Sequence, residues 1–163
     1  MDLETLNKWD AQLHAFVALA APEAECGSGP LSGVSAGVKD IFDVAGLPTK
    51  CGSATRADAA PALADAPVVA SLRAAGAQII GKTTTTEFAF ADPTNCRNPH
   101  DLNRSPGGSS SGFGAAVAAG LVDSALGTQT AGSICRPAAY CGVVGFKPSF
   151  GVLSTKGVAP MAP

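Results

Sequence analysis

The sequence predicts an α/β fold. Apolar patterns of helical and of strand-like period alternate along the chain. A stretch rich in glycine, serine and alanine, residues 105–147, lies between segments of both kinds. Because small residues let backbones approach closely and leave N–H groups free to point into a site, this stretch is expected to position functional groups. The 163 residues are enough for one domain with a buried core.

The first half of the chain is expected to contain two helices and two strands. Apolar residues at helical spacing predict an amphipathic first helix that Pro22 stops, and VSAGVKDIFDVAG reads as a buried strand running into a turn. The expected elements are a helix over 3–20, a loop over 22–33, a strand over 34–46, an irregular segment over 46–64, a helix over 67–75 and a strand over 78–81.

The second half is expected to hold a helix of small residues between short strands. Its asparagines and prolines predict a long loop, and loops of that length in compact domains are usually functional or disordered. The expected elements are an ambiguous strand or helical turn over 83–90, the long loop over 92–106, a helix over 109–121, a strand over 122–126, a small-residue loop over 127–132, a helical turn over 133–140 interrupted by Pro137, and a strand over 143–146.

Composition excludes several classes of function. A formal charge of −2 without any run of Lys or Arg gives no basic face, so direct nucleic-acid binding is not expected. The acidic N-terminus and the short apolar run 15–21 predict neither a signal peptide nor a membrane span, and we expect a cytoplasmic protein. Five cysteines without CxxC spacing predict neither a disulfide framework nor a metal site, and no cofactor is expected.

Two familiar nucleophile patterns do not fit. Residues 108–112 match GxSxG with Ser110 at its centre, but loop rather than strand precedes them and no histidine follows the serine. GGSSSG lacks the lysine of a phosphate loop. Cys96 and His100 lie four residues apart in a proline-containing loop, which is a weak indication of a thiol nucleophile.

A lysine can instead serve as the base for a serine, provided that burial lowers its pKa. Lys39 lies within the apolar run GVSAGVKDIF and is the strongest candidate, although an edge-strand lysine that reaches solvent would give the same pattern. Lys82 follows a glycine at a strand end and is expected to be exposed. Lys147 ends an expected strand before Pro148, which favours a structural role.

Five ordered segments within residues 33–163 resemble the amidase signature family. They are GVSAGVKD, Gly81-Lys82 followed by Glu87-Phe88, Asn98-Pro99, PGGSSSG, and LGTQTAGSICRPAAYCGVVGFKPSFG. The resemblance implies a mixed β-sheet flanked by helices, an α/β/α sandwich of which this chain holds only the N-terminal part. It also implies a single amidase signature domain over residues 1–163, truncated at the C-terminus.

The resemblance implies a catalytic triad of Lys39, Ser109 and Ser133, with a cis peptide bond before Ser109. In the family, the lysine deprotonates the bridging serine, which in turn deprotonates the nucleophile, here Ser133. The oxyanion would bind main-chain N–H groups of Thr130, Ala131, Gly132 and Ser133. Ala131 stands where the family usually has glycine, which restricts φ at one position.

The position of Arg136 distinguishes this chain within the family. The family's arginine most often lies two residues after the nucleophile, whereas here Cys135 holds that place and Arg136 follows. This pattern most resembles malonamidase-type members, in which the arginine helps to bind a substrate carboxylate. A structural ion pair with an acidic residue is the alternative role for Arg136.

The function implied is hydrolysis of a small carboxylic amide to a carboxylate and ammonia through an acyl-enzyme. The alternatives are the glutamine-hydrolysing A subunit of a tRNA-dependent amidotransferase, which works inside a complex, and an inactive truncated remnant. The expected partner is a small-molecule amide, with neither nucleic acid nor membrane, and the sequence is compatible with a homodimer.

Overall fold

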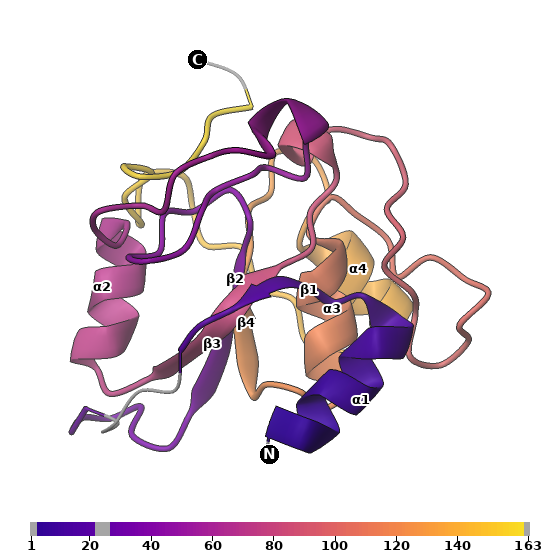
Figure 1. Cartoon of the computed structure of the whole chain (residues 1–163), viewed down its shortest axis with the longest axis horizontal. Coiled ribbons are helices and arrows are strands. Elements are labelled where there is room, and N and C mark those ends of the chain that lie inside the picture. Colours follow the sequence, from indigo (N-terminus) through magenta and orange to yellow (C-terminus); the bar gives the residue numbers. More distant parts are fainter. Residues whose placement is uncertain (1–2, 22–26, 162–163) are drawn as a thin grey trace.

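The computed structural model describes residues 3–21 and 27–161, so the first part of the expected loop, residues 22–26, lies outside the described residues. Within these described residues, four strands form one sheet in the order β1-β3-β2-β4 (Figure 1). β2 runs parallel to both β3 and β4, whereas β1 is antiparallel to β3, which confirms a mixed sheet. The strands are β1 Phe16–Leu19, β2 Ser35–Lys39, β3 Gln78–Thr83 and β4 Ser124–Leu126.

Helices cover both faces of this sheet. In Figure 1, α2 lies on one side of the sheet and α1, α3 and α4 lie on the other. The helices are α1 Leu3–Leu13, α2 Pro67–Ala74, α3 Ser111–Ala118 and α4 Cys135–Cys141, with short 3₁₀ helices at Ala54–Arg56 and Glu87–Ala89. The predicted α/β fold, with a mixed sheet between helical layers, is therefore confirmed.

Each face of the sheet carries its own apolar core. Toward α2, a cluster of buried residues includes Val38, Val69 and Ile79, and Val158 and Ala159 of the C-terminal segment pack against it. Toward α1 and α3, a second cluster packs small helix residues against the N-terminal region, through Leu13, Ala15, Phe16, Ala115 and Ala116. Burying apolar area on both faces provides the main driving force for the three-layer arrangement.

The expected helix over 3–20 is wrong in its second half, because the chain leaves the helix after Leu13. His14 has a positive φ of 52°, and the Asp10 carboxylate accepts hydrogen bonds from the N–H groups of Ala15 at 2.7 Å and Phe16 at 3.1 Å. These N–H groups are consequently unavailable to a continuing helix. Residues 16–19 instead pair with β3 as an edge strand.

The strand expected over 143–146 is also absent. Val144 and Phe146 are 92% and 77% exposed, and the segment joins none of the ladders between the described residues. The N–H of Val143 instead donates to the Ala138 carbonyl of α4, so the segment continues from the end of this helix and does not pair as a strand. Pro137 does not interrupt the helical turn, because it lies in the first turn of α4, where a missing N–H costs nothing.

Three parallel strands end at one edge of the sheet. β2 ends at Lys39, β3 at Thr83 and β4 at Leu126, and Lys39 pairs with Thr83 in the ladder. Loops that follow parallel strands therefore meet at this edge, which is where open α/β sheets bind ligands. The small-residue loop 127–133 leaves β4 at this point.

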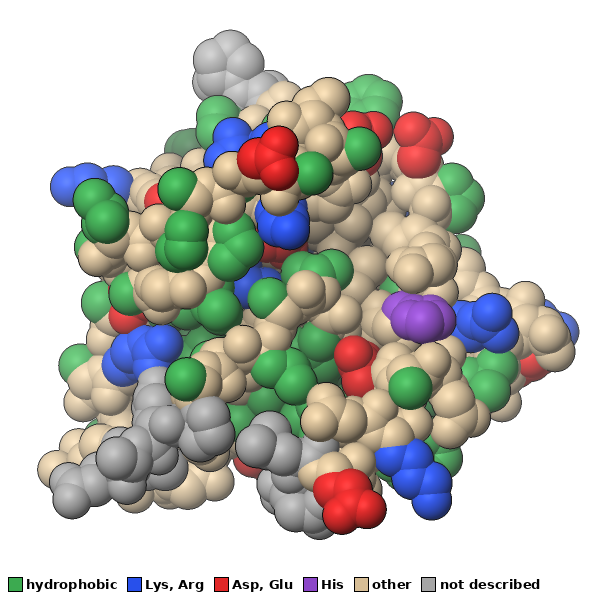
Figure 2. Space-filling view, in the orientation of Figure 1, with side chains coloured by type: hydrophobic (Ala, Val, Ile, Leu, Met, Phe, Trp, Pro, Cys, Tyr) green, Lys and Arg blue, Asp and Glu red, His purple; other side chains and the backbone are tan. Residues whose placement is uncertain are grey.

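The surface drawn in Figure 2 carries basic and acidic side chains scattered among each other, with apolar side chains between them. Within residues 3–21 and 27–161, none of the helices combines the length and the apolar character that a bilayer crossing requires.

Glycines let α3 approach both the sheet and α4. A Cβ on Gly112 would lie 2.1 Å from the Ala15 carbonyl oxygen and 2.5 Å from the Thr84 nitrogen. A Cβ on Gly114 would lie 2.8 Å from the Pro137 carbonyl oxygen. Since these neighbours are backbone atoms, they cannot move aside as a flexible side chain could.

We predict that Gly112→Ala lowers the free energy of unfolding by at least about 2 kcal/mol, because the added methyl overlaps two backbone atoms. Helix propensity alone predicts the opposite sign, a gain of about 1 kcal/mol. Urea unfolding followed by circular dichroism would measure the change. Ala70→Gly, at an exposed position of α2, is the control and should cost only about 1 kcal/mol. A more stable Gly112→Ala protein would contradict the close packing.

Candidate active site

Lys39 is fully buried at the carboxyl end of β2. Its Nζ donates hydrogen bonds to Ser109 Oγ at 2.7 Å and to Thr128 Oγ1 at 2.9 Å. Among the described residues, no carboxylate lies within salt-bridge distance of it. Burial lowers the pKa of Lys39 to about 7, because desolvation penalises the ammonium form. A substantial fraction of this amine is therefore neutral near pH 7 and able to accept a proton.

Ser109 lies two residues before α3 and is also buried. The Gly108-Ser109 peptide bond is cis, as the family resemblance implied. The Ser109 carbonyl accepts a hydrogen bond from the N–H of Thr86 at 3.0 Å, which ties this turn to the segment after β3. Ser111 is the first residue of α3 and therefore lies in the first turn of that helix.

Ser133 lies at the end of the loop that follows β4. It is half-buried and lines a cavity of about 580 Å³ together with Ser109 and Thr128. The N–H of Ser110 donates to the Ser133 carbonyl at 3.3 Å, so the two serine-bearing turns are in direct contact. No hydrogen bond joins the hydroxyls of Ser109 and Ser133 in the described part of the chain. The fold thus brings Lys39 and Ser109 into contact and opens Ser109 and Ser133 to one cavity.

The N–H groups around Ser133 divide into two sets. Those of Ile134, Cys135 and Arg136 already have acceptors, namely Gln129 Oε1 for the first two and the Gly132 carbonyl for the third. Within residues 3–21 and 27–161, the N–H groups of residues 130–133 contact no acceptor. Ala131 does not have a positive φ, so alanine replaces glycine there without backbone strain.

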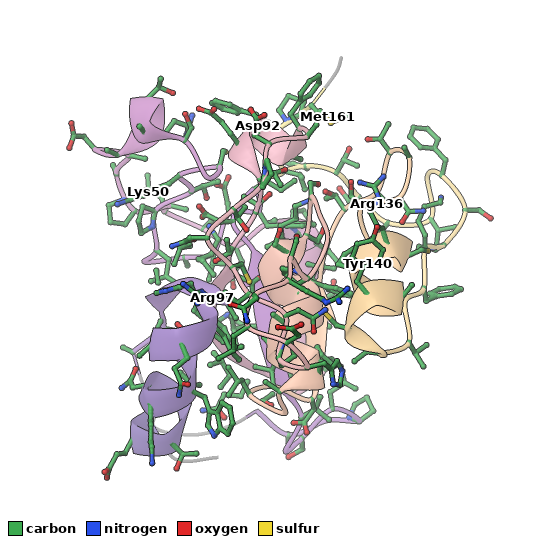
Figure 3. The ribbon with its side chains drawn as sticks, turned by 90° about the vertical axis from the view of Figure 1, so that its right-hand side faces the viewer. Lys50, Asp92, Arg97, Arg136, Tyr140 and Met161 are labelled. Atoms are coloured by element: carbon green, nitrogen blue, oxygen red, sulfur yellow. The ribbon has the colours of Figure 1, made fainter. Side chains whose placement is uncertain are left out.

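Arg136 lies at the N-terminal end of α4, one turn before Tyr140 (Figure 3). Its Nη1 donates to the Gly108 carbonyl at 3.4 Å, and its Nη2 would lie 3.2 Å from a Cβ on Gly132. The guanidinium therefore contacts the residues that precede Ser109 and Ser133. It does not itself line the cavity, and among the described residues it has no carboxylate partner within 4.0 Å.

Lys82 is not exposed, which overturns the sequence expectation. It is fully buried and forms an ion pair with Asp40, in which Nζ and Oδ1 are 2.9 Å apart. Its Nζ also donates to the Pro48 carbonyl and to Thr49 Oγ1. Because Lys82 pairs with Val38 in the ladder, and neighbouring residues of a strand face opposite sides, Lys82 and Lys39 lie on opposite faces of the sheet.

The other candidate side chains contact neither Lys39 nor the hydroxyls of Ser109 and Ser133 among the described residues. Burial raises the pKa of the Cys96 thiol, and the His100 Nε2 contacts the Cys141 carbonyl at 2.9 Å instead of a thiol. Ser110 Oγ donates to the Thr128 carbonyl and not to a lysine. Lys147 is exposed and does not end a strand. In the described ranges, no group of three His, Cys, Asp or Glu side chains could hold a metal ion.

Two contacts were missed by sequence reasoning. Thr128 is the second partner of the Lys39 amine, and Gln129 accepts the two N–H groups that begin α4. Both are polar residues within the small-residue loop 127–133. A polar side chain in a loop that is expected to form the site is the sequence feature that could have identified them.

At this sheet edge, a buried lysine is hydrogen-bonded to one serine, and a second serine lines the same cavity. A lysine in such a setting is chemically able to serve as the base for a serine. The sequence profile described as Amidase matches residues 6–163. This chain belongs to the amidase family.

Two relatives are similar in sequence to nearly the whole or most of this chain. The A subunit of glutamyl-tRNA(Gln) amidotransferase from Methanospirillum hungatei is 46% identical in an alignment 159 residues long that covers 94% of this chain and 36% of the relative. AtzE, a 1-carboxybiuret hydrolase subunit from Pseudomonas sp. strain ADP, is 47% identical in an alignment 137 residues long that covers 80% of this chain and 30% of the relative. The chain thus spans about a third of the length of these relatives.

Solved structures share the fold. The A subunit of glutamyl-tRNA(Gln) amidotransferase from Thermotoga maritima superposes with a TM-score of 0.91 at 38% identity, covering 96% of this chain and 36% of that one. Peptide amidase of Stenotrophomonas maltophilia superposes with a TM-score of 0.74 at 41% identity, covering 81% and 29%. The described fold therefore corresponds to part of the amidase fold.

We predict opposite stability effects for the two buried lysines. Lys82→Met leaves Asp40 charged and unpaired, and should lower the free energy of unfolding by about 3–5 kcal/mol. Lys39→Met removes a buried amine that has no ionic partner in the described part of the chain, and should leave stability unchanged or raised. Since the pKa of Lys39 falls from 10.5 unfolded to about 7 folded, wild-type stability should rise between pH 7 and 10.5.

Lys39→Met should abolish that rise, so its advantage over wild type is largest below pH 7 and shrinks as the pH increases. Denaturant unfolding at pH 6 and pH 9.5 measures both effects. Equal destabilisation by the two substitutions would show that Lys39 has an ionic partner after all.

Proposed function

We propose that this chain carries the catalytic centre of a serine amidase that cleaves a small carboxylic amide. The observation that supports this most is the buried Lys39 amine, which contacts Ser109 Oγ at 2.7 Å and has no carboxylate among the described residues to hold its proton. A neutral amine in this position can act as a general base. The amidase family membership of residues 6–163 supports the same chemistry.

In the proposed reaction, Lys39 takes the proton of Ser109, which takes that of Ser133. The Ser133 oxygen forms a bond to the amide carbonyl carbon, and the C–N bond then breaks as Ser109 delivers a proton to the leaving amine. Water subsequently hydrolyses the acyl-enzyme to the carboxylate. The free N–H groups of residues 130–133 would stabilise the oxyanion, where the loss of one donor typically costs about 10²–10³ in rate.

A second candidate function is glutamine hydrolysis as the A subunit of a tRNA-dependent amidotransferase. Relatives with this name support it, at 46% identity for one of them. Release of ammonia from glutamine, and copurification with other proteins of such a complex, would favour this function over that of a stand-alone amidase.

Arg136 is proposed to bind a carboxylate on the substrate, as in malonamidase-type members of the family. Its guanidinium lies against Gly132 and Gly108, which precede the two serines, and it has no acidic partner among the described residues. A planar guanidinium with free donors suits paired hydrogen bonds to a carboxylate.

The nucleophile can be tested by covalent labelling. A fluorophosphonate probe should modify Ser133 of the chain, and mass spectrometry of peptides should locate the adduct. We expect the labelling rate to rise with pH around 7, because Lys39, with a pKa of about 7, must lose its proton before it can act as a base.

Ser133→Ala should abolish labelling. Lys39→Met should slow labelling strongly, and the remaining rate should no longer depend on pH. Ser110→Ala is the matched control and should leave the modified residue unchanged. An adduct on Ser110, or labelling that persists in Ser133→Ala, would refute the proposed nucleophile.

The role of Arg136 can be tested with two amides of similar length, a half-amide of a dicarboxylic acid and a neutral amide. Arg136→Gln should raise KM for the carboxylate-bearing amide by about tenfold or more, because a charge-assisted hydrogen bond contributes about 1.5–3 kcal/mol. Values for the neutral amide should stay unchanged. An equal loss with both amides would indicate that Arg136 only holds the two serine turns together.

A further inference from the structure

Gln129 closes the loop that carries Ser133. Its side chain is half-buried, and its Oε1 accepts hydrogen bonds from the N–H groups of Ile134 at 2.9 Å and Cys135 at 2.8 Å. Both distances are those of well-formed N–H···O bonds. The Gln129 side chain therefore links the two ends of the segment 130–133, because its amide oxygen binds the two residues that follow this segment.

These bonds supply an acceptor for the backbone N–H groups at the start of α4. The first N–H groups of a helix have no acceptor within the helix, and a side chain at the cap position usually supplies one. The cap residue of α4 is Ile134, whose apolar side chain makes no such bond. Gln129 supplies the acceptor from five residues upstream.

The other end of the loop is tied to the candidate catalytic lysine. Thr128 Oγ1 accepts a hydrogen bond from Lys39 Nζ, and the Thr128 carbonyl accepts one from Ser110 Oγ at 3.3 Å. Residues 129–133 are thus held between the lysine and α4. Without the Gln129 bonds, this end of the loop would keep only the backbone bonds to the carbonyls of Gly132 and Ser133 and would lose its side-chain link to the first N–H groups of α4.

The same bonds separate the occupied N–H groups from the free ones. Gln129 occupies the N–H groups of Ile134 and Cys135, and the Gly132 carbonyl occupies that of Arg136. Only the N–H groups of residues 130–133 are left without an acceptor among the described residues of this turn. The bonds thus hold the turn in the conformation in which these four N–H groups lack acceptors among the described residues, and Thr130 and Ser133 of this turn line the cavity.

We propose that Gln129 is a positioning residue that sets the conformation of the nucleophile turn, so that Ser133 Oγ and the free N–H groups of residues 130–133 face the cavity together. This inference rests on the proposed role of Ser133. Gln129 needs no contact with the reacting atoms, because its effect passes through the backbone of the turn. An error of about 1 Å in such a position can cost about a hundredfold in rate.

The test compares Gln129→Met, which keeps the length of the side chain without the acceptor, with Gln129→Glu, which keeps an acceptor oxygen. Gln12→Met, at an exposed position of α1, controls for the chemical change itself. Three quantities are measured: the rate of fluorophosphonate labelling at Ser133, hydrogen exchange of the peptide covering residues 130–136, and the melting temperature.

We expect Gln129→Met to slow labelling by about tenfold to a hundredfold and to speed exchange at Ile134 and Cys135. Gln129→Glu should label at nearly the wild-type rate, and Gln12→Met should match wild type throughout. If Gln129→Met is unfolded at the assay temperature, Gln129→Asn, whose shorter side chain cannot reach both N–H groups, takes its place.

The inference is overturned if Gln129→Met labels as fast as wild type, or if Gln129→Glu is as slow as Gln129→Met. These results differ from a failure of the proposed function. In that case the wild-type chain itself would not be labelled, or Ser133→Ala would be labelled equally.

Discussion

The candidate site depends on a buried lysine that has no counter-charge among the described residues. Among the described residues, the Lys39 amine donates to the hydroxyls of Ser109 and Thr128, and desolvation brings its pKa to about 7. The sheet separates the Lys39 amine from a second buried lysine and its carboxylate partner. On the opposite face, Asp40 is paired with Lys82, so the carboxylate next to Lys39 in sequence is already neutralised by another cation. The amine can therefore remain a base.

Close backbone packing brings the second and third residues of the candidate triad to this amine. α3 contains glycines where a Cβ would overlap the backbone of Ala15, Thr84 or Pro137. The helix consequently approaches the sheet and α4 closely enough for the turn at Ser109 to reach Lys39 and for α4 to hold the loop of Ser133. The small residues of α3 bury little apolar surface area. The larger side chains around Val38 and Val69 bury more apolar area on the other face of the sheet.

Hydrogen bonds in the loop 127–133 serve two purposes. Thr128 and Gln129 link the loop to Lys39, α3 and α4, whereas the N–H groups of residues 130–133 stay without acceptors in the described chain. A backbone held in place at both ends can keep donors unpaired until a ligand arrives, and preorganised donors are worth most in a site of low dielectric. The chain spans 36% of one of its amidase relatives, and the described part already contains all of these groups.

The sequence alone predicted the α/β class, the long loop over 92–106, and the resemblance to amidases that singled out Lys39, Ser109 and Ser133. These features follow from local pattern and from motifs with a fixed order. The end of the first helix, the missing strand over 143–146 and the burial of Lys82 were decided by the tertiary structure. Each depends on a partner distant in sequence or on the neighbouring strand: β1 forms because β3 offers an edge, residues 143–146 find no such edge, and Lys82 is buried because Asp40 faces it. Spacing along the chain carries no information on such partners, because only the folded sheet brings them together.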